Sequence, residues 1–277
     1  MRNLVYIRDY TKNDVAKVFC LAKEIEAGKH EQALRQKTFA LFFPPSSIRT
    51  RVTFEKGIAQ MGGQPILFPS DALDKKEDIG DVVLYLNNWI DCVIVRHSHT
   101  ALVKKMAENP ATPIINAMTN DNHPCEILSD LYSLSKQKED YLHLKYLYVG
   151  ANSNIGITWQ QAARILGLDF TQCAPEAYAI EGVRLETDIT KAIVGKDVVL
   201  TDSINPNSLN DFKQYQITEE LMNKAGVGAL LNPCPPFYRG EEVSQNAIES
   251  KYFVGYGFKK SLLCVEQAII LFSMQTE

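Results

Sequence analysis

The sequence predicts an α/β protein with two doubly wound parallel-sheet domains, and three observations support this fold class. The chain has 277 residues, which is roughly two domains of about 150 residues each. Short apolar runs alternate with helical patterns along the sequence, as in parallel sheets whose faces are both covered by helices. Hydrophobic residues make up 45% and charged residues 22%, which excludes a disordered or collagen-like chain.

The first half of the chain predicts four strands separated by helices. Thr11 to Asp14 reads as a capping box, and apolar residues at helical spacing follow it as far as Gly28. A buried strand is indicated by the apolar run that ends at Pro44 and Pro45. The expected strands are 38–43, 65–68, 92–95 and 113–116, and the expected helices between them are 52–61, 79–89 and 102–108.

The second half repeats the alternation. We expect a helix over 126–136 to join the two halves, followed by a helix at 158–166 and strands at 146–149, 168–173, 198–201 and 227–231. An amphipathic helix over 261–274 is expected to pack back on the first domain. The predicted domains are therefore residues 1–127 and 128–260, with a returning segment at 261–277.

Charge and chain composition restrict the class of protein. Lys plus Arg is 29 and Asp plus Glu is 33, so the net charge is −4, which argues against general nucleic-acid binding. No stretch approaches the run of about 18 apolar residues that a membrane span needs, and the first nine residues lack a signal-peptide pattern. Six cysteines without CxxC spacing indicate reduced thiols in a cytoplasmic protein.

Ser46 to Arg51 is a candidate anion site, because it lies between an expected strand and the start of an expected helix. Free amides and the helix dipole favour an anion at such a turn. Two hydroxyls and two guanidinium groups add the donors that phosphate requires. On this segment alone, a capped helix with solvated arginines is the favoured interpretation.

Three further polar segments follow expected strands, where a parallel sheet has its ligand crevice. Arg96-His97 follows strand 92–95, and His123 to Glu126 follows strand 113–116. Cys234 to Val243 follows strand 227–231. Taken singly each motif is weak, and His123 in isolation is better explained as an ordinary loop histidine.

Taken in order, these segments resemble the aspartate and ornithine carbamoyltransferases over essentially the whole chain. Ser47 to Arg51 matches the family's Ser-x-Arg-Thr-Arg phosphate loop. His123 to Asp130 matches its His-Pro-x-Gln-x-Leu-x-Asp signature, except that Glu126 replaces the glutamine. Arg96-His97 and Arg239 to Val243 match two further motifs.

The resemblance implies carbamoyl transfer from carbamoyl phosphate to an amine, without a metal or organic cofactor, in the setting of arginine biosynthesis. Residues 1–127 would bind carbamoyl phosphate and residues 128–260 the amino-acid acceptor. Thr50, Arg96 and His123 would stabilise the oxyanion, and Cys234 is the fourth expected catalytic residue. The implied ligands of carbamoyl phosphate are Ser47, Ile48, Arg49, Thr50, Arg96, His123, Glu126 and Arg239. The resemblance also implies a homotrimer in which Lys75 or Lys76 reaches a neighbouring subunit's site, although a solvated loop is the simpler interpretation of these lysines.

The acceptor half departs further from the family pattern. Asn154 is retained from the family's Gly-Asp-Gly-Asn-Asn segment, and Cys234 is retained from its His-Cys-Leu-Pro loop. Asp202 is retained from the family's Asp-x-x-x-Ser-Met-Gly loop, but Ser203 to Asn207 replaces the rest of that loop. The Arg-x-Gln-x-Glu-Arg signature of the aspartate type is absent. Ornithine or a similar amino compound is therefore the favoured acceptor, with another diamine, an N-acylated amino acid or aspartate as alternatives.

Two other classes of function stay open at this point. Strand 146–149 followed by Gly150 and Gly156 suggests a nucleotide-binding oxidoreductase, but Asn152 fills the second glycine position of G-x-G-x-x-G. Glu126 and the altered loop from Ser203 suggest a non-catalytic binding protein on the same fold. Glu126 itself either pairs with an arginine, is protonated, or belongs to a site that handles the donor differently.

Overall fold

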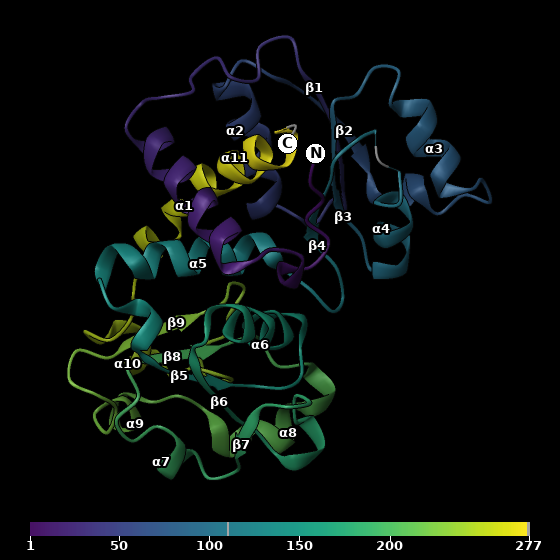
Figure 1. The fold of residues 1–277 in the computed structure, drawn as a ribbon. Coiled ribbons are helices and arrows are strands. Elements are labelled where there is room, and N and C mark those ends of the chain that lie inside the picture. Colours follow the sequence, from purple (N-terminus) through teal and green to yellow (C-terminus); the bar gives the residue numbers. More distant parts are fainter. Residues whose placement is uncertain (110, 276–277) are drawn as a thin grey trace. The chain divides into compact units, whose positions relative to one another are not determined.

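The computed structural model describes residues 1–109 and 111–275, which form two compact units (Figure 1). The first unit comprises Met1–Leu134 and the C-terminal segment from Lys259, and the second comprises Ser135–Phe258. The chain leaves the first unit within α5 (Pro124–Gln137) and returns just before α11 (Ser261–Met274). The expected boundaries, after residues 127 and 260, fall inside α5 and immediately before α11.

The first unit is built on a four-stranded parallel sheet with the order β2-β1-β3-β4. The two inner strands, β1 and β3, are almost wholly buried because helices cover both faces. Figure 1 shows α3 and α4 on one side of this sheet and α1, α2 and α11 on the other. The strands are β1 (Thr38–Phe43), β2 (Gln64–Pro69), β3 (Cys92–Arg96) and β4 (Ile114–Met118), and the helices between them are α1 (Lys12–Glu26), α2 (Arg49–Gln60), α3 (Ile79–Leu86) and α4 (Thr100–Met106).

Helix α1 begins at the predicted capping box. The Thr11 hydroxyl accepts a hydrogen bond from the Asp14 amide at 3.2 Å, and the Asp14 carboxylate accepts one from the Thr11 amide at 2.9 Å. These two bonds satisfy donors that a helix start otherwise leaves unpaired. Gly28 follows the helix with φ of +77°, a conformation that suits glycine.

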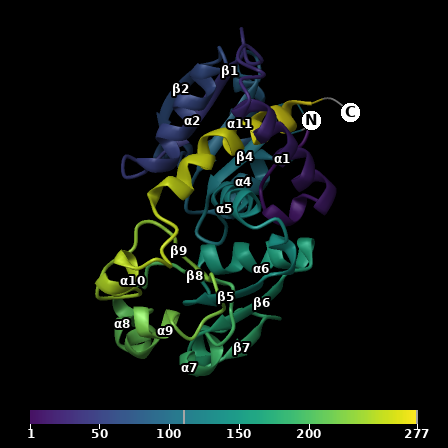
Figure 2. The ribbon, with the colours of Figure 1, turned by 90° about the vertical axis from the view of Figure 1, so that its left-hand side faces the viewer.

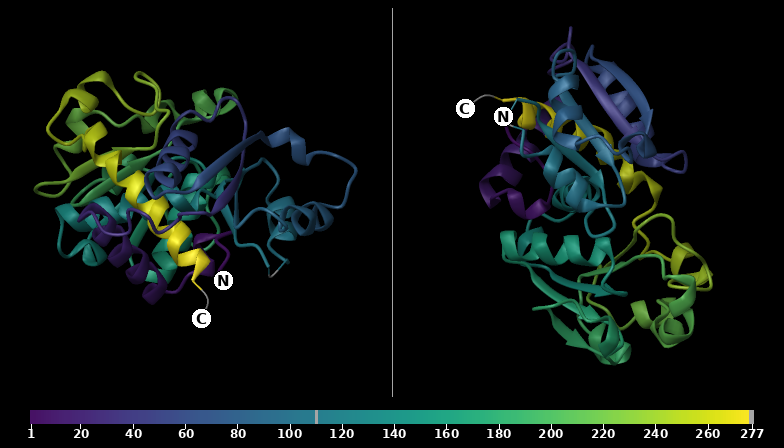
Figure 3. Two further views of the ribbon diagram at one scale, coloured as in Figure 1. Left: turned by 90° about the horizontal axis from the view of Figure 1, so that it is seen from above. Right: turned by 90° about the vertical axis from the view of Figure 1, so that its right-hand side faces the viewer.

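Helix α11 has the predicted bounds, but the prediction that it is amphipathic is wrong. It is buried on nearly every side, and even Glu266 and Gln267 are inaccessible to solvent. Figures 2 and 3 show the reason: α11, in yellow, lies across α1 and α2. A helix enclosed in this way needs no polar face, and its packing on the first unit confirms that part of the fold prediction.

The second unit contains a five-stranded parallel sheet with the order β7-β6-β5-β8-β9. Its strands are β5 (Lys145–Val149), β6 (Asp169–Cys173), β7 (Arg184–Glu186), β8 (Val198–Thr201) and β9 (Leu230–Pro233). Helix α6 (Asn154–Leu166) covers one face, where Trp159 packs on Tyr146. The helices α7 (Ile189–Ala192), α8 (Leu209–Phe212), α9 (Glu219–Met222) and α10 (Gln245–Glu249) are short, and apolar residues from each of them join the core on the other face.

Two strand predictions in this unit need correction. The strand expected at 227–231 begins only at Leu230, because Val227 lies fully exposed in a turn and Gly228 has φ of +73°. Strand β7 was not predicted, since its three residues include an arginine and a glutamate and form no apolar run.

Four helices, α2, α4, α5 and α6, begin earlier than periodicity predicted, and the extensions of α2 and α6 include candidate site residues. Helix α2 starts at Arg49 instead of residue 52, and α6 starts at Asn154 instead of residue 158. Apolar spacing detects a helix only where its apolar face begins, so the polar first turn of α2 escapes it, and in α6 the first turn is interrupted by Gly156. None of the helices in the described ranges is long and apolar enough to cross a membrane.

Candidate functional site

The first unit places its polar motifs at the point where the strand order reverses. Strand β1 has β2 on one side and β3 on the other, so the connections that follow β1 and β3 diverge and leave a crevice at the strands' carboxyl ends. Ser46 to Arg51 follows β1, and Arg96 ends β3. The Arg96 guanidinium donates a hydrogen bond to the Ser47 hydroxyl at 3.1 Å. The structure thus brings together two motifs that lie far apart in the sequence.

The turn after β1 ends in a helix start that has no side-chain cap. Ile48 occupies the cap position of α2, and its side chain makes no capping hydrogen bond. Ser47 and Thr50 are buried, whereas the side chains of Ile48 and Arg49 are exposed. An uncapped helix start with hydroxyl and guanidinium groups around it is suited to bind a phosphate.

The two arginines of this turn differ in their surroundings. Arg51 pairs with Glu55 on the next turn of α2 at 3.6 Å. The Arg49 side chain forms no ion pair with any residue that the structure describes, although its charge helps to lower the pKa of Glu126. Arg49 is therefore the arginine available to an anion, and Arg51 supports the helix.

His123 is a buried, uncharged histidine at the start of α5. Burial lowers its pKa to about 4, the positive charges of Arg96 and Lys259 act in the same direction, and Glu126 opposes them. The imidazole is therefore neutral at physiological pH, and it can donate a hydrogen bond without adding charge.

Glu126 is paired, and its partner is a lysine instead of the arginine considered from sequence. The Lys259 ammonium donates to the Glu126 carboxylate at 2.8 Å and to the Asp130 carboxylate at 2.6 Å. Burial acts to raise the pKa of Glu126, but the positive charges of Lys259, above all, and of Arg49 outweigh it and hold that pKa below its ordinary value of 4.5. Glu126 is therefore an ionised carboxylate. Lys259 lies 133 residues away and belongs to none of the motifs, so no sequence pattern points to this ion pair.

A cavity of about 320 Å³ opens at the carboxyl ends of β3 and β4. Arg96 and His97 line it with Asp74 and with residues of the loops that follow these strands. His97 is buried and its Nε2 lies 2.9 Å from the Asp74 carboxylate. Of the pair that sequence singled out, Arg96 faces the phosphate turn and His97 anchors the loop that contains Asp74.

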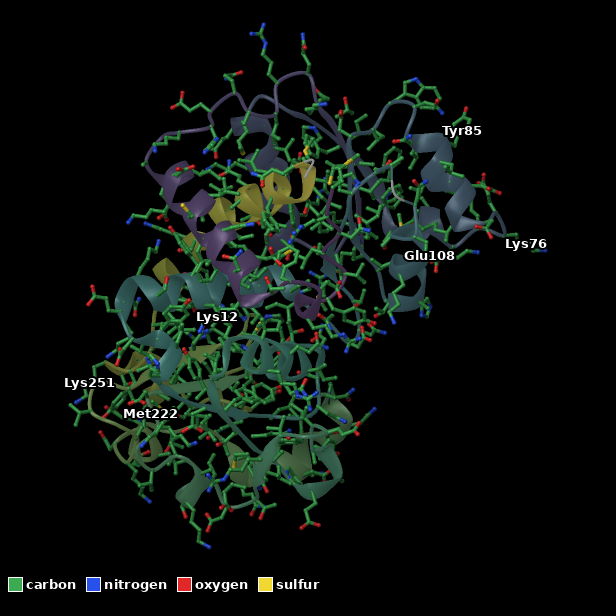
Figure 4. All side chains as sticks on the ribbon, in the orientation of Figure 1. Lys12, Lys76, Tyr85, Glu108, Met222 and Lys251 are labelled. Carbon is green, nitrogen blue, oxygen red and sulfur yellow. The ribbon has the colours of Figure 1, made fainter. Side chains whose placement is uncertain are left out.

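Lys75 and Lys76 follow directly after Asp74 in an exposed loop between β2 and α3. Figure 4 shows Lys76 at the outer tip of this loop, with its side chain pointing into solvent. The two lysines are thus accessible to another molecule.

The second unit has a switch point of its own, between β5 and β8. Gly150 to Asn154 follows β5, Asp202 follows β8 and Cys234 follows β9. The Cys234 amide donates to the Thr201 carbonyl at 2.8 Å, which holds the ends of β8 and β9 together. The three acceptor-site candidates therefore occupy the strand ends where a ligand is expected.

Tyr148 lies among these residues and was missed from sequence. Its hydroxyl lies 2.9 Å from the Ser153 hydroxyl and donates to the Ala151 carbonyl at 3.1 Å. Burial raises the pKa of Tyr148 well above its ordinary value of 10.0, with Asp202 and Cys234 adding to the effect. Tyr148 is therefore a neutral phenol that orders the loop after β5.

The packing of Tyr148 also explains the glycines that suggested a nucleotide site. A Cβ atom on Gly156 would lie 2.5 Å from the Tyr148 ring, and one on Gly150 would lie 2.8 Å from its hydroxyl. The two glycines give space to this ring, so they are no evidence for a pyrophosphate.

Arg239 and Glu242 lie in the segment after β9. Arg239 is exposed, and its guanidinium donates to the Tyr256 hydroxyl at 3.4 Å. Glu242 is buried, accepts a hydrogen bond from the Tyr238 amide at 2.6 Å, and has its pKa raised by burial to about 7. Glu242 thus fixes the backbone next to Arg239.

All six cysteines are free thiols, and five of them are buried, as expected for small apolar residues. Cys20 is exposed. Among residues 1–109 and 111–275, no group of three or more His, Cys, Asp or Glu side chains is arranged to hold a metal ion.

Comparisons with known proteins agree with this arrangement. A family model described as "Aspartate/ornithine carbamoyltransferase, carbamoyl-P binding domain" matches residues 2–136, and one described as "Aspartate/ornithine carbamoyltransferase, Asp/Orn binding domain" matches residues 143–272. An ornithine carbamoyltransferase of Desulfotalea psychrophila is 31% identical, over 97% of this chain and 97% of the relative.

Solved structures give the same result. The ornithine carbamoyltransferase of Pyrococcus furiosus aligns with a TM-score of 0.92 and 26% identity, over 98% of this chain and 96% of the other. That of Burkholderia thailandensis aligns with a TM-score of 0.90 and 27% identity, over 99% of both chains. Since the two family models together span almost the whole sequence and its motifs lie at the two switch points, the chain belongs to the aspartate/ornithine carbamoyltransferase family.

Proposed function

We propose that the protein transfers a carbamoyl group from carbamoyl phosphate to the side-chain amine of ornithine and releases phosphate. The observation that carries this proposal is the contact between Arg96 and Ser47 at the switch point of the first sheet, next to the uncapped start of α2. His123, an uncharged donor, lies in the connection that follows β4, the strand next to β3. Curated relatives named ornithine carbamoyltransferase support the choice of acceptor.

In the proposed mechanism the amine nitrogen attacks the carbamoyl carbon, and the bond from that carbon to the phosphate oxygen breaks. An alkylamine has a pKa near 10, so it must lose one proton before it attacks. The proton that the nitrogen loses after attack leaves with the phosphate. Ser47, the Ile48 amide, Arg49, Thr50 and Arg239 hold the phosphate and neutralise its charge as it leaves. This neutralisation makes phosphate a good leaving group.

Thr50, Arg96 and His123 stabilise the oxyanion that forms during attack. His123 contributes a neutral hydrogen-bond donor, because its pKa of about 4 keeps it unprotonated. Removal of one such donor typically costs about 100- to 1000-fold in rate. Glu126 accepts a hydrogen bond from the carbamoyl amide, which a carboxylate does more strongly than a neutral amide oxygen.

Asn154, Asp202 and Cys234 form the proposed acceptor site. They lie at the strand ends of the second unit, with Tyr148 beneath the loop that leads to Asn154. Because Ser203 to Asn207 departs from the ornithine-type loop, aspartate, another diamine or an N-acylated amino acid are the competing acceptors.

A colorimetric assay for ureido products over a panel of amines, with carbamoyl phosphate as donor, tests the proposal. We expect ornithine to give the largest kcat/KM. A larger value for another amine would replace the acceptor, and no ureido product with any amine would favour a non-catalytic binding protein.

We also propose a cytoplasmic homotrimer that acts in arginine biosynthesis. Support for self-association comes from the exposed loop with Lys75 and Lys76, and from Leu84, Tyr85 and Trp89, apolar side chains exposed on and just after α3. Figure 4 labels Tyr85 near the outer edge of the first unit. Light scattering coupled to gel filtration tests this: about three times 31.2 kDa is expected, and a monomer mass would contradict it.

A further inference from the structure

We propose that Lys259 is a positioning residue of the donor site, whose ammonium allows Glu126 to serve there as an ionised carboxylate. This inference rests on the proposed function and assigns a role to a residue outside every motif. Glu126 and Lys259 would then be a compensating pair, in which the lysine makes the glutamate compatible with a phosphorylated ligand.

The geometry shows a bridging cation between two buried carboxylates. Glu126 and Asp130 are four residues apart on α5, so they lie on the same face of the helix. Their side chains are 10% and 2% exposed, and the Lys259 Nζ lies 2.8 Å from one carboxylate and 2.6 Å from the other. Two like charges at this spacing repel each other unless a cation lies between them.

The position of this cluster connects it to the donor site. Glu126 lies one turn of α5 after His123, and its electrostatic environment includes Arg49 as well as Lys259. A carboxylate at this place repels a phosphate dianion, because charges interact strongly where water is excluded. The family's glutamine has no such charge and needs no cation. Lys259 offsets the repulsion and, through its hydrogen bond, also fixes the direction of the Glu126 carboxylate.

A double-mutant cycle tests the compensation, with carbamoyl phosphate as the titrated ligand. We compare the dissociation constants of the wild type, Lys259→Met, Glu126→Gln and the double variant by calorimetry. Lys259→Met is expected to weaken binding about tenfold when residue 126 is glutamate, and much less when it is glutamine. The loss of the Lys259–Asp130 contact occurs with either residue at position 126, so its effect on the dissociation constant cancels in the cycle.

Two further variants separate this role from a purely structural one. Lys260 is the adjacent exposed lysine, so Lys260→Met is the matched control and is expected to leave the dissociation constant unchanged. Lys259→Arg retains the cation and is expected to restore most of the affinity. Thermal unfolding of every variant shows whether it folds. If Lys259→Met does not fold, Lys259→Gln takes its place in the cycle.

A coupling between positions 126 and 259 of about threefold or more supports the proposal. A smaller coupling, or equal loss of affinity in Lys260→Met, overturns it while the proposed function stands. If the wild type itself binds no carbamoyl phosphate, the proposed function fails and this inference fails with it.

Discussion

Replacing Arg49 with alanine separates anion binding from stability at the first turn of α2. The Arg49 side chain is exposed and forms no ion pair within residues 1–109 and 111–275. Its loss is therefore expected to change the free energy of unfolding by no more than about 0.5 kcal/mol. The α2 dipole, the Ser47 hydroxyl and the Arg96 guanidinium all remain in the variant.

The expected loss of affinity follows from one charged hydrogen bond. Such a bond contributes about 1.5–3 kcal/mol, and because each 1.4 kcal/mol is a factor of ten, the dissociation constant for carbamoyl phosphate should rise by about 12- to 140-fold. A bidentate contact between guanidinium and phosphate would place the effect near the upper end.

Arg51→Ala is the matched control, two residues further along the same helix. Arg51 pairs with Glu55 across one turn, a surface pair that is worth about 0.3–0.5 kcal/mol. We expect a small loss of stability and unchanged donor affinity. Calorimetric titration and thermal unfolding of both variants check the argument. Equal donor affinity in Arg49→Ala and the wild type would refute the assignment of the phosphate turn.

Three further outcomes are expected. His123→Ala should lower kcat about 100- to 1000-fold. The pH profile of wild-type kcat/KM should show no ionisation of His123 between pH 6 and 8, because the pKa of His123 is about 4. An inflection of that profile near pH 6.5 that disappears in the variant would contradict this. Cys234→Ala should raise the KM for the acceptor more than that for carbamoyl phosphate; unchanged KM values with a lowered melting temperature would make Cys234 a structural residue. Glu242 has its pKa raised by burial from 4.5 to about 7, so the stability that its protonated form provides is complete below about pH 4.5 and is lost as the pH rises through 7. The melting temperature of Glu242→Gln relative to the wild type should therefore be higher at pH 8 than at pH 5, and an equal difference at both would argue against a buried ionisation.

The fold could be predicted where burial leaves a continuous apolar signal. The bounds of β1, β8 and α11 match the sequence prediction, because each is a run of residues that are almost all buried. Val227 shows the limit of this signal: it is apolar yet exposed, so the apolar run predicts a strand where the structure has a turn.

The candidate site was predictable only where residues adjacent in sequence form one motif. The turn from Ser46 to Arg51 and the segment from His123 follow strands directly, so their spacing carries information. No sequence motif contains Lys259 or Tyr148. Lys259 reaches Glu126 from a distant part of the chain, and Tyr148 resembles any other buried aromatic residue of a strand. Lys259 enters the site through a tertiary contact, and Tyr148 through hydrogen bonds to the loop that follows it.

The placement of α11 has a consequence for how the polypeptide folds as it leaves the ribosome. The helix fills the space beside α1 and α2, yet its residues emerge after all of Ser135–Phe258. Domains usually fold in the order of synthesis. Here the segment up to Leu134 must wait, with apolar surfaces of α1 and α2 uncovered, while the later unit is completed. The nascent chain is thus most exposed to aggregation and to chaperone binding at its N-terminal half, until the final helix arrives.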